Sequence, residues 1–241
     1  AATVIATIEQ LERRIMARFP ERGLPLAAAE LKAAALDGAT VEARMRGWLP
    51  GVRWASRILS ALVAIGMALV LVIAAREADI TGSVRSVDWV ALVESTIQTL
   101  VFGGLTILFL QALPDRLERR QLLRQLHRLR SLAHVIDMHQ LTKDPERLRG
   151  DFQPTEQTVA IDLTRAQMQH YLDYCSELLS LVGKTAALTA EESQDSLILE
   201  TVSDIENLTT GMSRKIWQKI TLLASTGSGW PGRGVRLPGR H

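Results

Sequence analysis

The chain has little of the chemistry that secreted and catalytic proteins display. Its 241 residues include one cysteine, Cys175, which excludes an intrachain disulfide framework and fits a reducing compartment. The sequence has no glycine-rich phosphate loop, nucleophile elbow, cysteine-pair metal motif or pair of carboxylates in a catalytic pattern. We therefore expect a protein that is not an enzyme and needs no cofactor.

Strand patterns are also missing, because apolar and polar residues nowhere alternate convincingly, and this favours an all-α fold. Aromatic residues make up only 5% of the chain, and its net charge is +2. A nucleic-acid binder would need a broader basic surface with interleaved aromatic side chains. We therefore exclude nucleic acid as a partner.

Two long apolar runs dominate the sequence. Residues 58–75 and 95–114 carry no charged side chain. A spanning helix needs about 20 mostly apolar residues, and neighbouring residues extend the runs to spans of about 54–75 and 89–114. Trp54 and Trp89 lie where aromatic rings favour the headgroup region. We predict an integral membrane protein with a transmembrane hairpin at 53–114; the alternative is two core helices of a soluble protein.

Arginines indicate which way the predicted hairpin faces. They cluster before the first run and after the second, whereas the connector at 76–88 holds only Arg76 and Arg85. By the positive-inside rule both termini are cytoplasmic and the connector lies outside a plasma or inner membrane. The first apolar run begins after residue 50, so we expect no cleavable signal. Four basic residues are predicted to meet anionic lipid: Arg116, Arg119, Arg120 and Arg124.

Small and polar residues distinguish the two predicted spans. Small residues that favour close helix packing are Ser60, Ala64, Ala68, Gly103 and Gly104. At 100° per residue, the second span carries two adjoining polar stripes, Glu94 with Gln98, and Ser95 with Thr99 and Thr106. Two interpretations stay open: hydrogen bonds within the hairpin or between subunits, or a water-filled pore with Glu94 at its outer mouth.

Helical periodicity predicts the segments on either side. Residues 1–52 read as three short helices, separated at Pro20 and at Asp37-Gly38, which we expect to pack on the membrane surface or on another chain. The second span is predicted to continue to about Gln140. Residues 115–225 carry three stripes with coiled-coil-like spacing and predict a cytoplasmic helical bundle. Residues 226–241 read as a flexible tail.

The predicted bundle holds one weak hint of metal chemistry. His134 and Asp137 are three residues apart on one helix, a spacing that metal ligands use, and His170 is a third candidate ligand. Solvated or hydrogen-bonded histidines are the alternative. Cys175 lies in an apolar stripe, where a buried structural thiol is expected.

These patterns favour a self-associating membrane scaffold or regulator that presents a cytoplasmic helical bundle. Its expected partners are the lipid bilayer, further copies of the chain and a protein bound at the bundle. The alternative is a subunit of an oligomeric ion channel or transporter, lined by the polar face of the second span.

Overall fold

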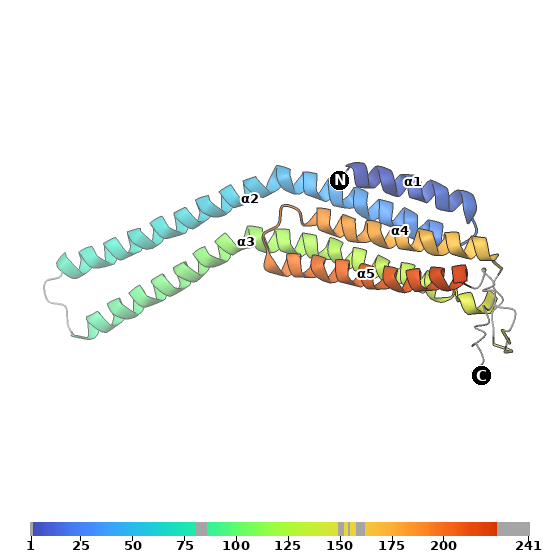
Figure 1. The fold of residues 1–241 in the computed structure, drawn as a ribbon. Coiled ribbons are helices and arrows are strands. Elements are labelled where there is room, and N and C mark those ends of the chain that lie inside the picture. The colour runs from blue at the N-terminus through green and yellow to red at the C-terminus, as the bar shows by residue number, and fades with distance from the viewer. Residues whose placement is uncertain (1, 81–85, 149–151, 154, 158–161, 226–241) are drawn as a thin grey trace, which may run out of the picture. The chain divides into compact units, whose positions relative to one another are not determined.

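The computed structural model describes residues 2–80, 86–148, 152–153, 155–157 and 162–225. Over these ranges the protein is all-helical (Figure 1), so the predicted all-α fold is confirmed. The elements in chain order are α1 (Ala2–Arg18), α2 (Leu24–Ile80), α3 (Ser86–Leu141), the 3₁₀ helix η1 (Pro145–Leu148), α4 (Arg165–Thr189) and α5 (Ser196–Ser225). The predicted tail at 226–241 lies outside the described residues.

The chain divides into two compact units. The first, which we call the helix pair, is Ala39–Arg124. The second, which we call the bundle, combines Ala1–Gly38 with Gln125–His241, as far as these residues are described. The helices α2 and α3 contribute residues to both units, whereas α1, α4 and α5 belong to the bundle.

The core of the bundle follows the periodicity of the sequence. The buried stripe of α1 is Ile8, Leu11 and Ile15, and that of α3 is Leu126, Leu129, Ala133 and Ile136. The buried stripe of α4 is Met168, Leu172, Cys175, Leu179, Val182 and Ala186. The buried stripe of α5 is Ile198, Val202, Ile205, Met212, Ile216, Ile220 and Leu223. Because a spacing of three and four residues keeps side chains on one helix face, these stripes meet in one core. The same spacing includes Val4 on α1 and Leu208 on α5, which are only half-buried.

The N-terminal helix belongs to the bundle. Phe19 lies edge-on to Tyr171 and Tyr174 of α4, with ring centroids 5.3 Å and 6.2 Å apart. Arg14 of α1 forms an ion pair of 3.0 Å with Glu177 of α4. We had expected this segment to pack on the membrane surface or on another chain. Local patterns did not reveal its partner, because α4 is far away in the sequence.

The predicted helix break at Asp37-Gly38 is wrong, since α2 runs without interruption from Leu24 to Ile80. Asp37 forms an ion pair of 3.6 Å with Arg128 of α3, and a single glycine costs a helix only about 1 kcal/mol. Pro50 also lies inside α2. An internal proline costs a helix about 3 kcal/mol, yet α2 continues through it, and the preceding Leu49 is buried.

The long third helix was predicted correctly. It continues through Pro114 and ends at Leu141, one residue from the predicted end. The start of α4 has a local cause as well. Thr164 and Gln167 form a capping box, in which each side chain pairs with the backbone of the other, and this satisfies N–H groups that the first turn leaves free.

Candidate functional site on the helix pair

Within the helix pair, α2 and α3 lie side by side and antiparallel (Figure 1). Arg53 forms an ion pair of 3.2 Å with Glu118. Ser56 donates a hydrogen bond to the backbone oxygen of Leu110. Further along, Met67 lies against Gly103. The partner's number falls as the number on α2 rises, and this fixes the antiparallel register.

The two helices are in close contact at Gly103. A Cβ atom added there would overlap the Met67 side chain, whereas one added at Gly104 would meet nothing within 4 Å. The less exposed positions on both helices recur every three or four residues, and we call them the seam. They are Ser56, Ser60, Val63, Met67 and Leu71 of α2, and Thr96, Thr99, Gly103, Ile107 and Leu110 of α3.

Outside the seam, the helix pair exposes an apolar belt. Its members on α2 are Ile58, Leu62, Ile65, Leu69 and Val72, and those on α3 are Ile97, Val101, Phe102, Leu105 and Leu108. The most apolar 18-residue window is 6% buried in α2 and 0% buried in α3, and both helices are long and apolar enough to cross a membrane. Core helices of a soluble protein would be mostly buried, so the protein's own fold does not explain this belt.

The predicted polar stripes separate in the structure. Thr99 is half-buried at the seam, whereas Glu94, Ser95, Gln98 and Thr106 are exposed. The Nε2 atom of Gln98 donates to Oε1 of Glu94 at 3.2 Å, and the Thr106 hydroxyl donates to the backbone oxygen of its own helix at Phe102, at 2.7 Å. The hydrogen bonds of Gln98 and Thr106 therefore stay within α3, and α2 leaves Glu94 and Gln98 exposed.

The predicted small residues also take different positions. Ser60 is buried in the seam, but Ala64 and Ala68 are exposed, and Gly104 lies beside the seam. The reason is geometric, because repeated steps of four residues drift about 40° each around an α-helix. Positions separated alternately by three and four residues stay on one side of the helix. The seam therefore continues from Ser60 through Val63 and Met67.

Basic side chains gather toward one end of the apolar belt. Arg57 lies over the Trp54 ring at 6.0 Å, and Arg116 lies over the Phe109 ring at 5.8 Å. The residues predicted to face lipid, Arg116, Arg119, Arg120 and Arg124, are all exposed. Arginine beside an aromatic ring combines an apolar stem and a charged head, as the water–membrane boundary requires. The sequence showed the arginines but not their aromatic partners.

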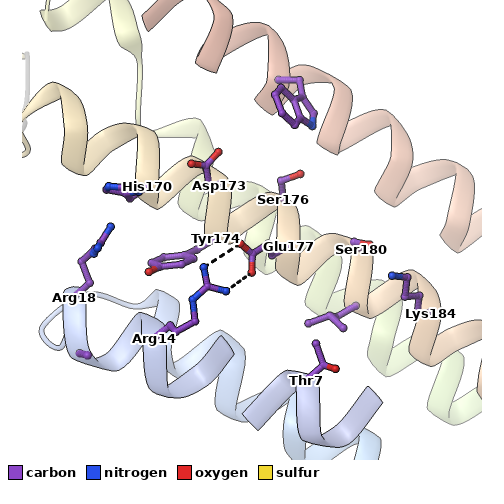
Figure 2. A pocket seen from close by; sticks show the side chains of 13 residues that line it. Thr7, Arg14, Arg18, His170, Asp173, Tyr174, Ser176, Glu177, Ser180 and Lys184 are labelled. Carbon is purple, nitrogen blue, oxygen red and sulfur yellow. Dashed lines mark hydrogen bonds and ion pairs between the residues drawn. The ribbon is translucent and has the colours of Figure 1, made fainter. Parts of the chain in front are cut away.

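The bundle contains an open groove of about 1050 Å³ along α1 and α4. Figure 2 shows Arg14 reaching across it to Glu177, with Tyr174 beside the pair. The Arg14 guanidinium lies 5.2 Å from the Tyr174 ring centre. Cationic and anionic side chains are mixed along the walls, and Arg14 is already paired. The groove therefore shows no preference for one class of charged ligand.

The predicted metal site has no support in the structure. Asp137 accepts a hydrogen bond of 2.7 Å from Gln140. His134 is exposed, and His170 lines the groove near Arg18 (Figure 2). Among the described residues, no three His, Cys, Asp or Glu side chains are grouped so that they could hold a metal ion.

Two reactive side chains of the bundle are enclosed to different degrees, since Cys175 is buried and Lys219 is half-buried. Cys175 is fully buried, and this burial raises the pKa of its thiol, which disfavours the nucleophilic thiolate. The Lys219 amine donates to the backbone oxygens of Gln140 at 2.9 Å and Lys143 at 3.3 Å. Lys219 therefore satisfies carbonyl groups at the end of α3, although burial lowers its pKa.

The environment of His139 predicts that the stability of the bundle depends on pH. Burial, followed by the nearby charge of Lys143, lowers the pKa of His139 below 6.5. The folded state thus favours the neutral imidazole, and its stabilising contribution is complete above pH 6.5 and lost as the pH falls. We expect the full-length protein in mild detergent to melt at a lower temperature near pH 5 than near pH 8. The decrease should be smaller in His139→Gln, and an equal decrease in both proteins would contradict this role.

Comparisons with protein families, curated proteins and solved structures find no match to this chain. Its function must therefore be inferred from its own geometry. The feature that stands out is the helix pair, with its apolar belt, its exposed polar residues and its arginines. Ser56 and Met67 are seam residues that are not predicted from the sequence, although their spacing of three and four residues with Ser60 and Val63 is a signal for them.

Proposed function

We propose that the helix pair is a transmembrane hairpin that anchors a self-associating scaffold or regulator. In this proposal both termini are cytoplasmic, the connector lies outside, and the bundle is presented to a protein partner in the cytoplasm. The observation that carries it is the apolar belt, which is exposed on both helices. In the bundle the Cys175 thiol is buried and the Lys219 amine is bound to backbone oxygens, which supports a binding function over an enzymatic one.

The energetics of the apolar belt favour a lipid environment. Transfer of one large aliphatic side chain out of water is worth about 1.5–3 kcal/mol, and the belt has ten large apolar side chains. Residues 58–75 form a helix about 27 Å long at 1.5 Å per residue, close to the hydrocarbon thickness of about 30 Å. The length and the exposed chemistry of the pair therefore both match a bilayer.

A fractionation experiment tests insertion directly. Membranes from cells that express the full-length chain are washed with high salt and then with alkaline carbonate. We expect the protein to stay in the membrane pellet and to be released only by detergent. Release by either wash would contradict insertion of the hairpin, because surface-bound proteins are removed by these treatments.

An ion channel or transporter subunit is the second candidate, and the exposure of Glu94 and Gln98 favours it. Against it, the same face of α3 continues as Val101, Leu105 and Leu108, which are exposed and apolar. Polar groups therefore occupy only one end of this face. Ion flux into liposomes tests the point: flux that depends on the protein and is abolished by Gln98→Leu would favour the channel over the scaffold.

A further inference from the structure

Each helix of the pair has a second stripe with seam-like spacing, on the side away from its partner. We call these the outer stripes. The outer stripe of α2 is Ile58, Leu62, Ile65, Leu69, Val72 and Arg76. The outer stripe of α3 is Glu94, Gln98, Val101, Leu105, Leu108 and Ala112. Every member is exposed except Ala112, which is half-buried. Alternating steps of four and three residues suit each stripe for packing against another helix.

The charged ends of the two outer stripes lie at the same level of the helix pair. Arg76 follows Met67 by nine residues and Glu94 precedes Gly103 by nine, and Met67 lies against Gly103. Nine residues correspond to about 14 Å along a helix and to half a turn around it. Arg76 and Glu94 are therefore equally far from the middle of the pair, but both are on faces that point away from the seam.

The apolar members of the two outer stripes also lie at the same levels of the helix pair. Continuing the antiparallel register of Met67 and Gly103 places Leu69 level with Val101 and Ile65 level with Leu105. Copies of one membrane protein share the same orientation and depth in the bilayer. A second copy alongside the first therefore brings the outer stripe of its α2 level with the outer stripe of α3, residue for residue.

We propose that the outer stripe of α3 in one copy packs against the outer stripe of α2 in a second copy, with Glu94 of the first paired with Arg76 of the second. This inference rests on the proposed membrane insertion. Opposite charge at the same depth selects a second copy over lipid as the occupant. It also selects α2 over a second α3, because two α3 stripes would bring Glu94 against Glu94.

The lipid environment also favours the pairing of Glu94 with Arg76 of a second copy. Glu94 already accepts a hydrogen bond from Gln98, so Arg76 of a neighbour would complete a chain of three polar groups near the edge of the hydrocarbon. Lipid tails offer polar groups no partner, and helices in membranes associate through such contacts. The contact joins two different surfaces, so the first copy retains a free α2 stripe and the second copy retains a free α3 stripe. Assembly can thus continue into a closed ring.

Changing the charges at Glu94 and Arg76 in differently tagged copies of the chain tests the pairing. Glu94→Gln and Arg76→Gln should each reduce co-purification of the two tags from mild detergent by roughly tenfold, the size of one interhelical polar contact. Glu94→Arg and Arg76→Glu should each do the same when expressed alone. Co-expression of the Glu94→Arg chain with the Arg76→Glu chain should restore co-purification, because both contacts between unlike chains are then complementary, one of them being the native pair of Glu94 with Arg76. Unchanged co-purification in the single variants would overturn the pairing.

Cysteine cross-linking in native membranes locates the surface. In a Cys175→Ala background, Val101→Cys in one tagged copy should form a disulfide with Leu69→Cys in the other. Leu100→Cys is the control, because Leu100 is similarly exposed but lies off the stripe. A preference for Val101 pairing with Val101, or no cross-link above the control, would overturn the proposal in favour of an α3–α3 contact or of lipid. The membrane-pellet fraction of each variant, measured in parallel, shows whether insertion itself has failed.

Discussion

Replacing Phe102 with arginine is expected to lower the recovery of the protein in the membrane fraction, whereas Met138→Arg should leave that recovery unchanged. The two side chains are 68% and 64% exposed, so neither change creates a cavity or an overlap. Phe102 is next to Gly103, at the middle of the apolar belt. An arginine at the centre of a spanning helix costs about 2.5–3.5 kcal/mol of insertion free energy, which corresponds to a factor of roughly a hundred or more.

Comparing Phe102→Arg with Met138→Arg shows whether water or lipid surrounds the apolar belt. In a soluble protein, arginine at an exposed position changes stability by less than about 0.5 kcal/mol. Both variants would then fractionate and melt like the parent protein. Carbonate extraction of the three proteins, followed by immunoblotting of pellet and supernatant, measures the effect. Equal recovery of Phe102→Arg and Met138→Arg in the pellet would mean that the belt is not in the hydrocarbon.

The second large effect is expected from Gly103→Leu. A Cβ atom at this position already overlaps the Met67 side chain, so Met67 would have to move and a leucine side chain would overpack the space between α2 and α3. Overpacking of this kind costs about 1–3 kcal/mol. We expect the melting temperature in mild detergent to fall by several degrees, and a disulfide engineered across the seam to form more slowly.

The neighbouring glycine supplies a matched control. A Cβ atom at Gly104 meets nothing within 4 Å, so Gly104→Leu should leave the melting temperature close to that of the parent protein. Met67→Ala removes the side chain that causes the overlap and should partly restore Gly103→Leu. Equal destabilisation by Gly103→Leu and Gly104→Leu would show that loss of glycine, and not the contact with Met67, is responsible.

The bundle could be read largely from the sequence, because its helices are amphipathic. Polar residues surround the stripes of α4 and α5, so the stripe through Cys175 is distinct and its burial was predictable. Two features were not. The break expected at Gly38 is overridden by packing, including the ion pair of Asp37 with Arg128. The docking of Phe19 on Tyr171 joins segments that no local pattern connects.

The helix pair was harder to read, because apolar residues surround both of its helices. With almost no polar residues to mark the outside, the sequence does not place the seam through Met67. It favours Ala64 and Ala68 as packing residues, and the structure leaves both exposed. The sequence identifies the polar residues of α3, but it does not show which of them face α2 and which face away from it. Thr99 is at the seam while Gln98 faces away, and only the position of α2 decides which of these neighbours is covered.

Labelling the connector from outside the cell tests the central claim most directly. In a Cys175→Ala background, Ser83→Cys places one thiol in the connector, and Ser203→Cys places one on an exposed position of α5. A membrane-impermeant maleimide should label Ser83→Cys in intact cells or spheroplasts, and Ser203→Cys only after the membrane is opened. Labelling of Ser203→Cys in sealed cells, or protection of Ser83→Cys until lysis, would contradict a transmembrane hairpin with both termini in the cytoplasm.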